Sequence, residues 1–151
     1  MRHATGHTDV WDATAGGAAL ASEGVESMAY TAQIVEEARK NIDFRREVVT
    51  GQHSQVVLMS IPVGGEIGEE THADVDQTLI FVSGEGEAVL EGQRQRVSAN
   101  TLCFVPAGTR HNFINTGAEP LQLYTVYAPP EHAPGTRFHT RAEADAAEHH
   151  A

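Results

Sequence analysis

The feature that most limits the fold of this chain is a long series of short segments with period-two alternation. From Phe44 to Ala128, runs rich in Val, Leu, Ile, Thr and Phe are separated by turn residues such as Gly51, Gly92 and Gly117. Such runs are typical of strands in an all-β sandwich or barrel. We expect strands at 45–50, 53–61, 77–83, 87–91, 94–97, 101–105, 111–115 and 121–127. The sequence therefore predicts an all-β barrel or jelly roll, because no helical pattern is long enough to build an α/β sheet.

The N-terminal part of the chain has a different composition. Residues 1–27 are rich in Gly and Ala, and Asp9 and Asp12 interrupt any apolar run. A secretory signal needs an uninterrupted apolar segment, so we expect a flexible extension of a cytoplasmic protein. Residues 31–41 carry apolar side chains at helical spacing and predict a short helix against the barrel.

These patterns divide the chain into an extension, a barrel and a C-terminal arm. We expect a single barrel domain with its leading helix at 28–128. Residues 129–151 are predicted to form an extended arm and a short helix, which begins at a capping box from Thr140 to Glu143. The histidines of the arm, including His132, are expected to be solvated.

Two polar stretches inside the barrel region place metal-binding side chains where they can meet. If residues 66–72 are extended, Glu70 and His72 project to the same face, because side chains alternate along a strand. Gln77 stands at the start of the returning strand, and His111 begins another strand after a Pro/Gly turn. Two imidazoles and one carboxylate form a facial triad, which suits a divalent transition metal such as Fe, Mn, Ni or Zn.

The same residues give the chain a resemblance to the cupin family, over roughly residues 42–128. The first cupin motif is matched in spacing by Gly64, Glu70, His72, Gln77 and Gly84. The second motif is matched by Asn100, Pro106, Gly108, His111 and Asn115. This resemblance implies the cupin double-stranded β-helix, a jelly-roll barrel, with short peripheral helices. It also implies a metal site at the positions of Glu70, His72, Gln77 and His111.

Two of the four ligand positions depart from the cupin pattern. Where the family has His, His, Glu and His, this chain has Glu70, His72, Gln77 and His111, so the number of carboxylates is kept. An amide oxygen is a weak ligand, so Gln77 either contacts the metal or binds a metal-bound water. Asn100 replaces a turn glycine, and Asn also adopts the left-handed conformation readily.

Three kinds of function fit such a site. The first is a metal-dependent oxygenase that acts on a small molecule, since two His and a carboxylate leave positions open on Fe(II). The second is a sugar or sugar-phosphate isomerase, because many short cupins resemble mannose-6-phosphate isomerase. Acidic residues near the expected barrel mouth argue against a phosphate; they are Glu66, Glu69, Asp74 and Asp76. The third is a non-catalytic module that binds a metal or small molecule.

A different ligand set is also possible within the same segment. His72, Asp74 and His111 could form the HxD…H triad of 2-oxoglutarate-dependent oxygenases, which share the barrel topology. Asp74 falls in a predicted turn, however, and no arginine follows His111 before Arg137 to hold the co-substrate carboxylate. The cupin alignment explains more positions.

Composition limits the partners. The formal net charge of −11 argues against nucleic acid and against anionic membrane surfaces. The single cysteine, Cys103, lies between apolar residues and is expected to be buried. Phe81, Phe104 and Phe113 are expected to line an apolar pocket for a small-molecule ligand or substrate. We also expect a homodimer, with segment 42–61 offering an edge strand to a second copy.

Overall fold

The computed structural model describes residues 29–149, so the predicted extension at 1–27 lies outside the described residues. The barrel and both helices belong to one compact unit, Gln33–Ala151. Its elements are α1 (Ile34–Lys40), β1 (Arg45–Thr50), β2 (Gln55–Ile61), β3 (Asp76–Ser83), β4 (Glu85–Leu90), β5 (Gln93–Ser98), β6 (Leu102–Val105), β7 (His111–Asn115), β8 (Leu121–Ala128), β9 (Arg137–Phe138) and α2 (Arg141–His149).

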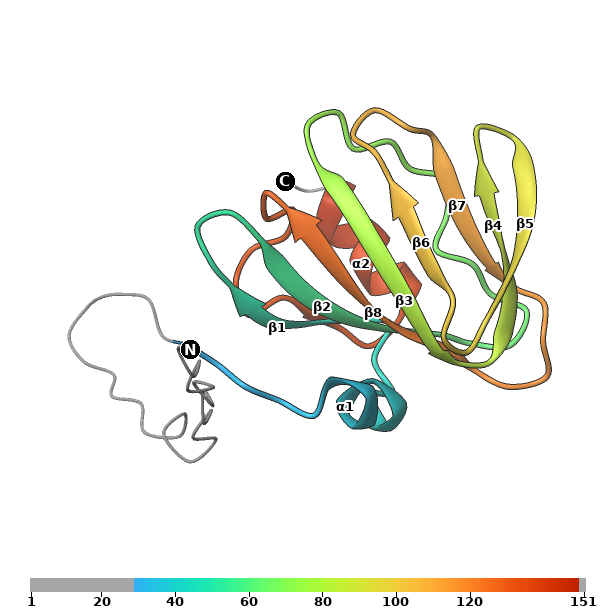
Figure 1. Ribbon diagram of the computed structural model, residues 1–151, viewed down its shortest axis with the longest axis horizontal. Helices are drawn as coiled ribbons and strands as arrows, with labels where there is room; N and C mark the ends of the chain where they lie inside the picture. Colours follow the sequence, from blue (N-terminus) through green and yellow to red (C-terminus); the bar gives the residue numbers. More distant parts are fainter. Residues whose placement is uncertain (1–28, 150–151) are drawn as a thin grey trace, which may run out of the picture. The chain divides into compact units, whose positions relative to one another are not determined.

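The strands form two antiparallel sheets that enclose one core (Figure 1). The larger sheet has the order β6-β3-β8-β2-β1-β9, and the smaller has the order β5-β4-β7. β8 alternates buried with less buried residues, and so does most of β3, because successive side chains point to opposite faces. β2 is buried along most of its length. The all-β jelly-roll barrel with short peripheral helices is confirmed.

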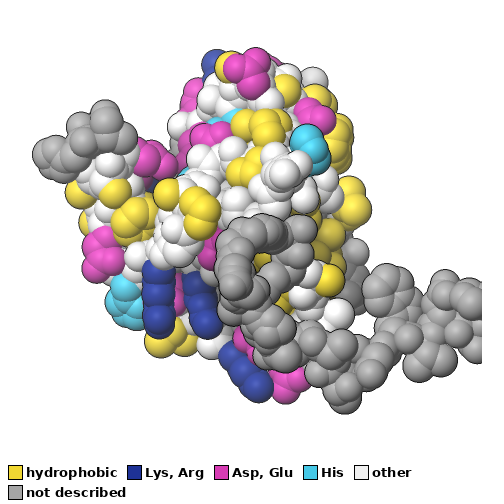
Figure 2. Space-filling model, turned by 90° about the vertical axis from the view of Figure 1, so that its left-hand side faces the viewer, with side chains coloured by type: hydrophobic (Ala, Val, Ile, Leu, Met, Phe, Trp, Pro, Cys, Tyr) yellow, Lys and Arg dark blue, Asp and Glu magenta, His cyan; other side chains and the backbone are white. Residues whose placement is uncertain are grey.

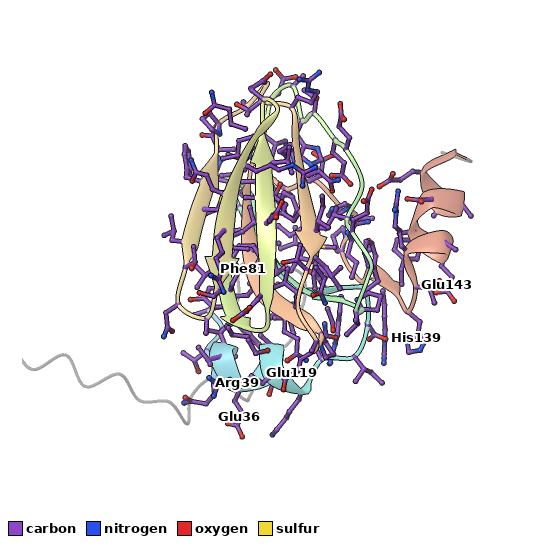
Figure 3. All side chains as sticks on the ribbon, turned by 90° about the vertical axis from the view of Figure 1, so that its right-hand side faces the viewer. Glu36, Arg39, Phe81, Glu119, His139 and Glu143 are labelled. Atoms are coloured by element: carbon purple, nitrogen blue, oxygen red, sulfur yellow. The ribbon has the colours of Figure 1, made fainter. Side chains whose placement is uncertain are left out.

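The core lies between the two sheets. β8 contributes Leu121, Leu123, Thr125 and Tyr127 from one face, all of them buried as the alternation predicted. Phe81 on β3 and Phe113 on β7 meet across the interior with their ring centroids 5.8 Å apart. Figure 3 shows Phe81 among the strands, whereas His139 and Glu143 lie beside the barrel with α2.

The prediction for Phe104 was wrong. β6 alternates so that Cys103 and Val105 face the core, and Leu102 and Phe104 face outward. Phe104 is 51% exposed and does not line a pocket. A strand places neighbouring residues on opposite faces, so a buried Cys103, which was predicted, excludes a buried Phe104.

Residues 66–72 form isolated bridges rather than a continuous strand. Glu66 pairs with Ile114, and Glu70 pairs with His111. Gly68 between them has φ +104°, a conformation that side chains with a Cβ rarely adopt. The segment therefore follows β7 with an interruption at Gly68, and still delivers Glu70 beside His111.

The C-terminal segment is attached to the barrel at several points. β9 pairs with Arg45 and Arg46 of β1, and Ala144 of α2 is buried in the core. The capping box is present in part, since the Glu143 amide donates to Thr140 Oγ1 at 3.2 Å. The domain boundaries at 28 and 128 stay a prediction.

The predicted leading helix is confirmed as α1. Ala38 is buried and Ile34 is partly buried, and both pack on the outer face of the larger sheet against Leu58, Val82 and Tyr124. Neither helix in residues 29–149 is long and apolar enough to span a membrane.

Candidate metal centre

The barrel brings three of the predicted ligands together. One ligand atom each from Glu70, His72 and His111 lie within 4.8 Å of one another. Glu70 and His111 face each other through two backbone hydrogen bonds of 2.9 Å, and the Gly108 amide donates to the His72 carbonyl at 2.7 Å. The two motifs, far apart in sequence, are thus joined by their backbones at the site.

Both imidazoles are held through Nδ1. His111 Nδ1 lies 2.8 Å from the Thr109 carbonyl, which can only accept, so Nδ1 carries the proton and Nε2 is free. His72 Nδ1 lies 3.2 Å from Glu131 Oε1. His72 Nε2 is 3.0 Å from Glu70 Oε2, yet it is buried and makes no well-aligned hydrogen bond within the described part of the chain. Histidines that bind metals are oriented in this way, with the second ring nitrogen bound to an oxygen.

Gln77 offers a neutral oxygen on the inner face of β3. Its side chain is buried, and its Nε2 donates to Thr125 Oγ1 at 3.1 Å. The Thr125 hydroxyl in turn donates to the Thr78 carbonyl at 3.0 Å, which fixes the orientation of the amide. Gln77 Oε1 is left without a hydrogen-bond partner among residues 29–149. A buried acceptor without a partner is costly, so this oxygen is available to a ligand, a water or an ion.

The charges around the triad are strongly coupled. Contacts with the carboxylates of Glu131 and Glu70 raise the pKa of His72 to about 9 in the metal-free protein. Burial lowers the pKa of His111, which is therefore neutral near pH 7. Burial alone would raise the pKa of Glu70, but the contact with His72 and the charge of Arg45 bring it below its usual range. Two nitrogens and one carboxylate, without a thiolate, fit a divalent transition metal.

The sequence did not indicate that Arg45, Glu131 and His132 belong to this region. Arg45 is 2% exposed, and its Nη2 lies 3.8 Å from Glu70 Oε1. His132 was expected to be solvated, which is wrong: its ring packs edge-on against Tyr127 with centroids 5.0 Å apart, and burial lowers its pKa to about 4. The arm has no hydrophobic period that could have placed it against the barrel.

The other acidic residues of the segment lie outside the triad. Asp74 is exposed and does not join the group of ligand atoms, so the alternative triad with Asp74 is not formed. Glu66 lies 3.7 Å from Arg141, and Glu69 lies 3.5 Å from Arg110. Asp76 accepts a hydrogen bond from the Ala107 amide. Part of the negative charge near the barrel mouth is therefore balanced.

The second cupin motif has structural roles at its other positions. Asn100 adopts a φ of +71°, as predicted for the residue that replaces a turn glycine. Asn115 donates to the Ile61 carbonyl at 2.9 Å and to the Glu119 carbonyl at 2.8 Å. Asn115 thus closes the turn between β7 and β8 on the end of β2.

Comparison with known proteins agrees with the fold and the motifs. The cupin domain model matches residues 57–127. An uncharacterized protein of Bacillus subtilis, YrkC, is 44% identical over 116 residues, which span 73% of this chain and 62% of that protein. An uncharacterized protein of Acanthamoeba polyphaga mimivirus is 36% identical over 114 residues, 73% of this chain and 71% of the relative.

A solved structure extends this similarity to three dimensions. The Bacillus halodurans protein BH2720 is 41% identical, with a TM-score of 0.77, and the match covers 78% of this chain and 93% of that protein. The two matched motifs, the jelly-roll barrel and these relatives lead to one conclusion: the chain belongs to the cupin superfamily.

Proposed function

We propose that Glu70, His72 and His111 hold one divalent transition metal, and that the protein is a metal-dependent oxygenase acting on a small molecule. The observation that supports this best is the convergence of three ligand atoms within 4.8 Å. The Nδ1 contacts of both imidazoles add to it, because they direct Nε2 toward the triad. When bound, a metal with two His and one carboxylate offers open positions to a small molecule and to dioxygen.

Gln77 is the residue that favours turnover over storage. Its amide oxygen is a weaker metal ligand than a carboxylate, so water or substrate can easily take its coordination position on the metal. A site that turns over needs such an exchangeable position, whereas a structural metal site is closed by four strong ligands. Arg45 partly balances the charge of the Glu70 carboxylate in the triad, since Arg45 Nη2 lies 3.8 Å from Glu70 Oε1.

Competition titration of two variants tests this proposal. Glu70→Gln removes the carboxylate and should abolish tight metal binding, whereas Gln77→Ala should keep the metal. The Gln77→Ala protein loaded with Fe(II) should then differ from wild type in oxygen uptake or in affinity for a small-molecule ligand. If Gln77→Ala lowers the metal affinity as much as Glu70→Gln does, Gln77 is a full ligand and the exchangeable position does not exist. A non-catalytic binding module is then the better description of the protein.

A further inference from the structure

We propose that the C-terminal arm completes the metal centre, with Glu131 as the residue that positions His72. This inference rests on the metal centre proposed above. Glu131 and His132 lie beyond residues 57–127, the part of the chain that matches the cupin domain. The structure nevertheless places the Glu131 carboxylate 3.2 Å from His72 Nδ1, whereas His72 Nε2 lies 3.0 Å from Glu70 in the triad.

Gln55 holds the arm at this place. Its side chain is buried, and its Oε1 accepts from the backbone amides of Glu131 at 3.2 Å and His132 at 3.0 Å. Its Nε2 donates to the His132 carbonyl at 2.6 Å and to Thr50 Oγ1 at 2.9 Å. One side chain on β2 therefore fixes the backbone on both sides of the Glu131–His132 peptide, so the carboxylate does not depend on a loose tail.

Aromatic packing against Tyr127 also holds the arm at the site. Tyr127 on β8 contacts His132 edge-on, at 5.0 Å between ring centroids, and contacts His72 in the same manner at 6.0 Å. Tyr127 is 1% exposed. The arm, Tyr127 and His72 thus form one packed group, in which His72 contacts Glu131 at Nδ1 and packs against the Tyr127 ring.

The chemistry of this contact concerns the ligand strength of His72. A carboxylate that accepts the Nδ1 proton fixes the tautomer with a free Nε2, orients the ring and increases the basicity of Nε2 toward a metal. His111 has the weaker partner, a neutral carbonyl at Thr109. Glu131 should therefore affect metal affinity through His72, although it is not itself one of the three ligands.

A set of full-length variants tests this role by chelator competition with Co(II) and Zn(II). The measurement is made above pH 9, where protons no longer compete for His72. There, Glu131→Ala should weaken metal binding by about 10–100-fold, the usual effect of losing such an outer contact. Glu131→Gln keeps a neutral acceptor for Nδ1 and should lose less. Glu87→Ala is the matched control, because Glu87 pairs with Arg94 at 2.6 Å on the other sheet. Its affinity should equal that of wild type.

Two further readouts separate positioning from folding. Above pH 9, where the charge of His72 no longer contributes to stability, Glu131→Ala should leave the melting temperature of the metal-free protein close to that of wild type. The same variant should change the visible absorption of the Co(II) form. Gln55→Ala, which frees the arm, should lower both the melting temperature and the metal affinity. If Glu131→Gln recovers metal affinity and Glu131→Ala keeps its melting temperature, Glu131 acts by positioning His72 through the hydrogen bond.

Contradictory results are distinguishable. If wild type binds the metal tightly and Glu131→Ala binds it equally well, the role of Glu131 is wrong and the metal centre stands. If Glu131→Gln binds the metal as weakly as Glu131→Ala does, the proposal that Glu131 positions His72 through a hydrogen bond is wrong. A wild-type chain that binds neither metal would overturn the proposed metal centre and, with it, this inference.

Discussion

In the proposed metal centre, His72 is the residue at which protonation and metal binding would compete. In the metal-free protein its pKa is raised to about 9, first by Glu131 and then by Glu70, so the ring is charged near pH 7. The raised pKa stabilises the metal-free fold fully below pH ~6.5, the unperturbed value, and this contribution is lost as the pH rises through about 9. A metal bound at the proposed site would take the place of the proton on Nε2.

Metal affinity should therefore rise with pH. Between pH 7 and 9, the dissociation constant should fall by about tenfold per pH unit, because one proton must leave His72 before the nitrogen can bind. His111 contributes no proton in this range, since burial lowers its pKa. Isothermal titration in buffers of different ionisation enthalpy measures the proton release directly. An affinity that is constant from pH 7 to 9 would contradict the assignment of His72 as a ligand.

The sequence predicted the candidate ligands but not the residues that surround them. Glu70, His72, Gln77 and His111 stand at fixed intervals around turns, so their spacing was readable without a structure. Arg45 and Glu131 reach the site only through the pairing of β1 with β2 and the hydrogen bonds of the arm to Gln55. Such contacts depend on tertiary structure and leave no local pattern.

At the scale of elements, the segment 66–72 shows how backbone conformation replaces a regular strand. Gly68 donates its amide to Asn112 Oδ1 at 2.9 Å and has φ +104°. A Cβ at this position would lie 2.7 Å from Arg141 Nη2 of α2. The sequence pattern predicted that residues 66–72 are extended, and the bridges at Glu66 and Glu70 agree with this. It could not predict the interruption at Gly68, because glycine is compatible with both a strand and a turn.

Gly68→Ala should accordingly destabilise the metal-free protein by about 1–3 kcal/mol, the usual cost of a strained backbone position. Urea unfolding measures this change. Gly51→Ala is the control, because its Cβ would make an ordinary contact of 3.6 Å and its φ is not positive. A Gly68→Ala protein as stable as the Gly51→Ala protein would show that the conformation at Gly68 carries no strain.

At the scale of the whole molecule, the acidic side chains on the face in Figure 2 lie in several places rather than in one patch. On the side shown in Figure 2, acidic and basic side chains are interspersed with apolar ones. The predicted edge at 42–61 is partly covered within the chain, since β9 pairs with Arg45 and Arg46. β6 ends the larger sheet on the other side, with Leu102 60% and Phe104 51% exposed.

The homodimer stays a prediction. An edge strand with exposed apolar side chains is a surface that a second copy could cover. Light scattering after size exclusion should give twice the mass of the 16.2 kDa chain. A monomer mass over a wide range of concentrations would contradict it.

Metal analysis of wild type and His72→Ala tests the central claim most directly. Both proteins are purified without a tag and dialysed against a chelator of moderate strength, which removes metal bound weakly by the terminal histidines, and are then analysed by mass spectrometry of the elements. Glu70, His72 and His111 place their ligand atoms within 4.8 Å, so the wild type should retain about one divalent transition metal per chain. His72→Ala should retain almost none. Equal metal content in the two proteins, or a wild type that holds none after incubation with Fe, Mn, Ni and Zn, would contradict the metal centre.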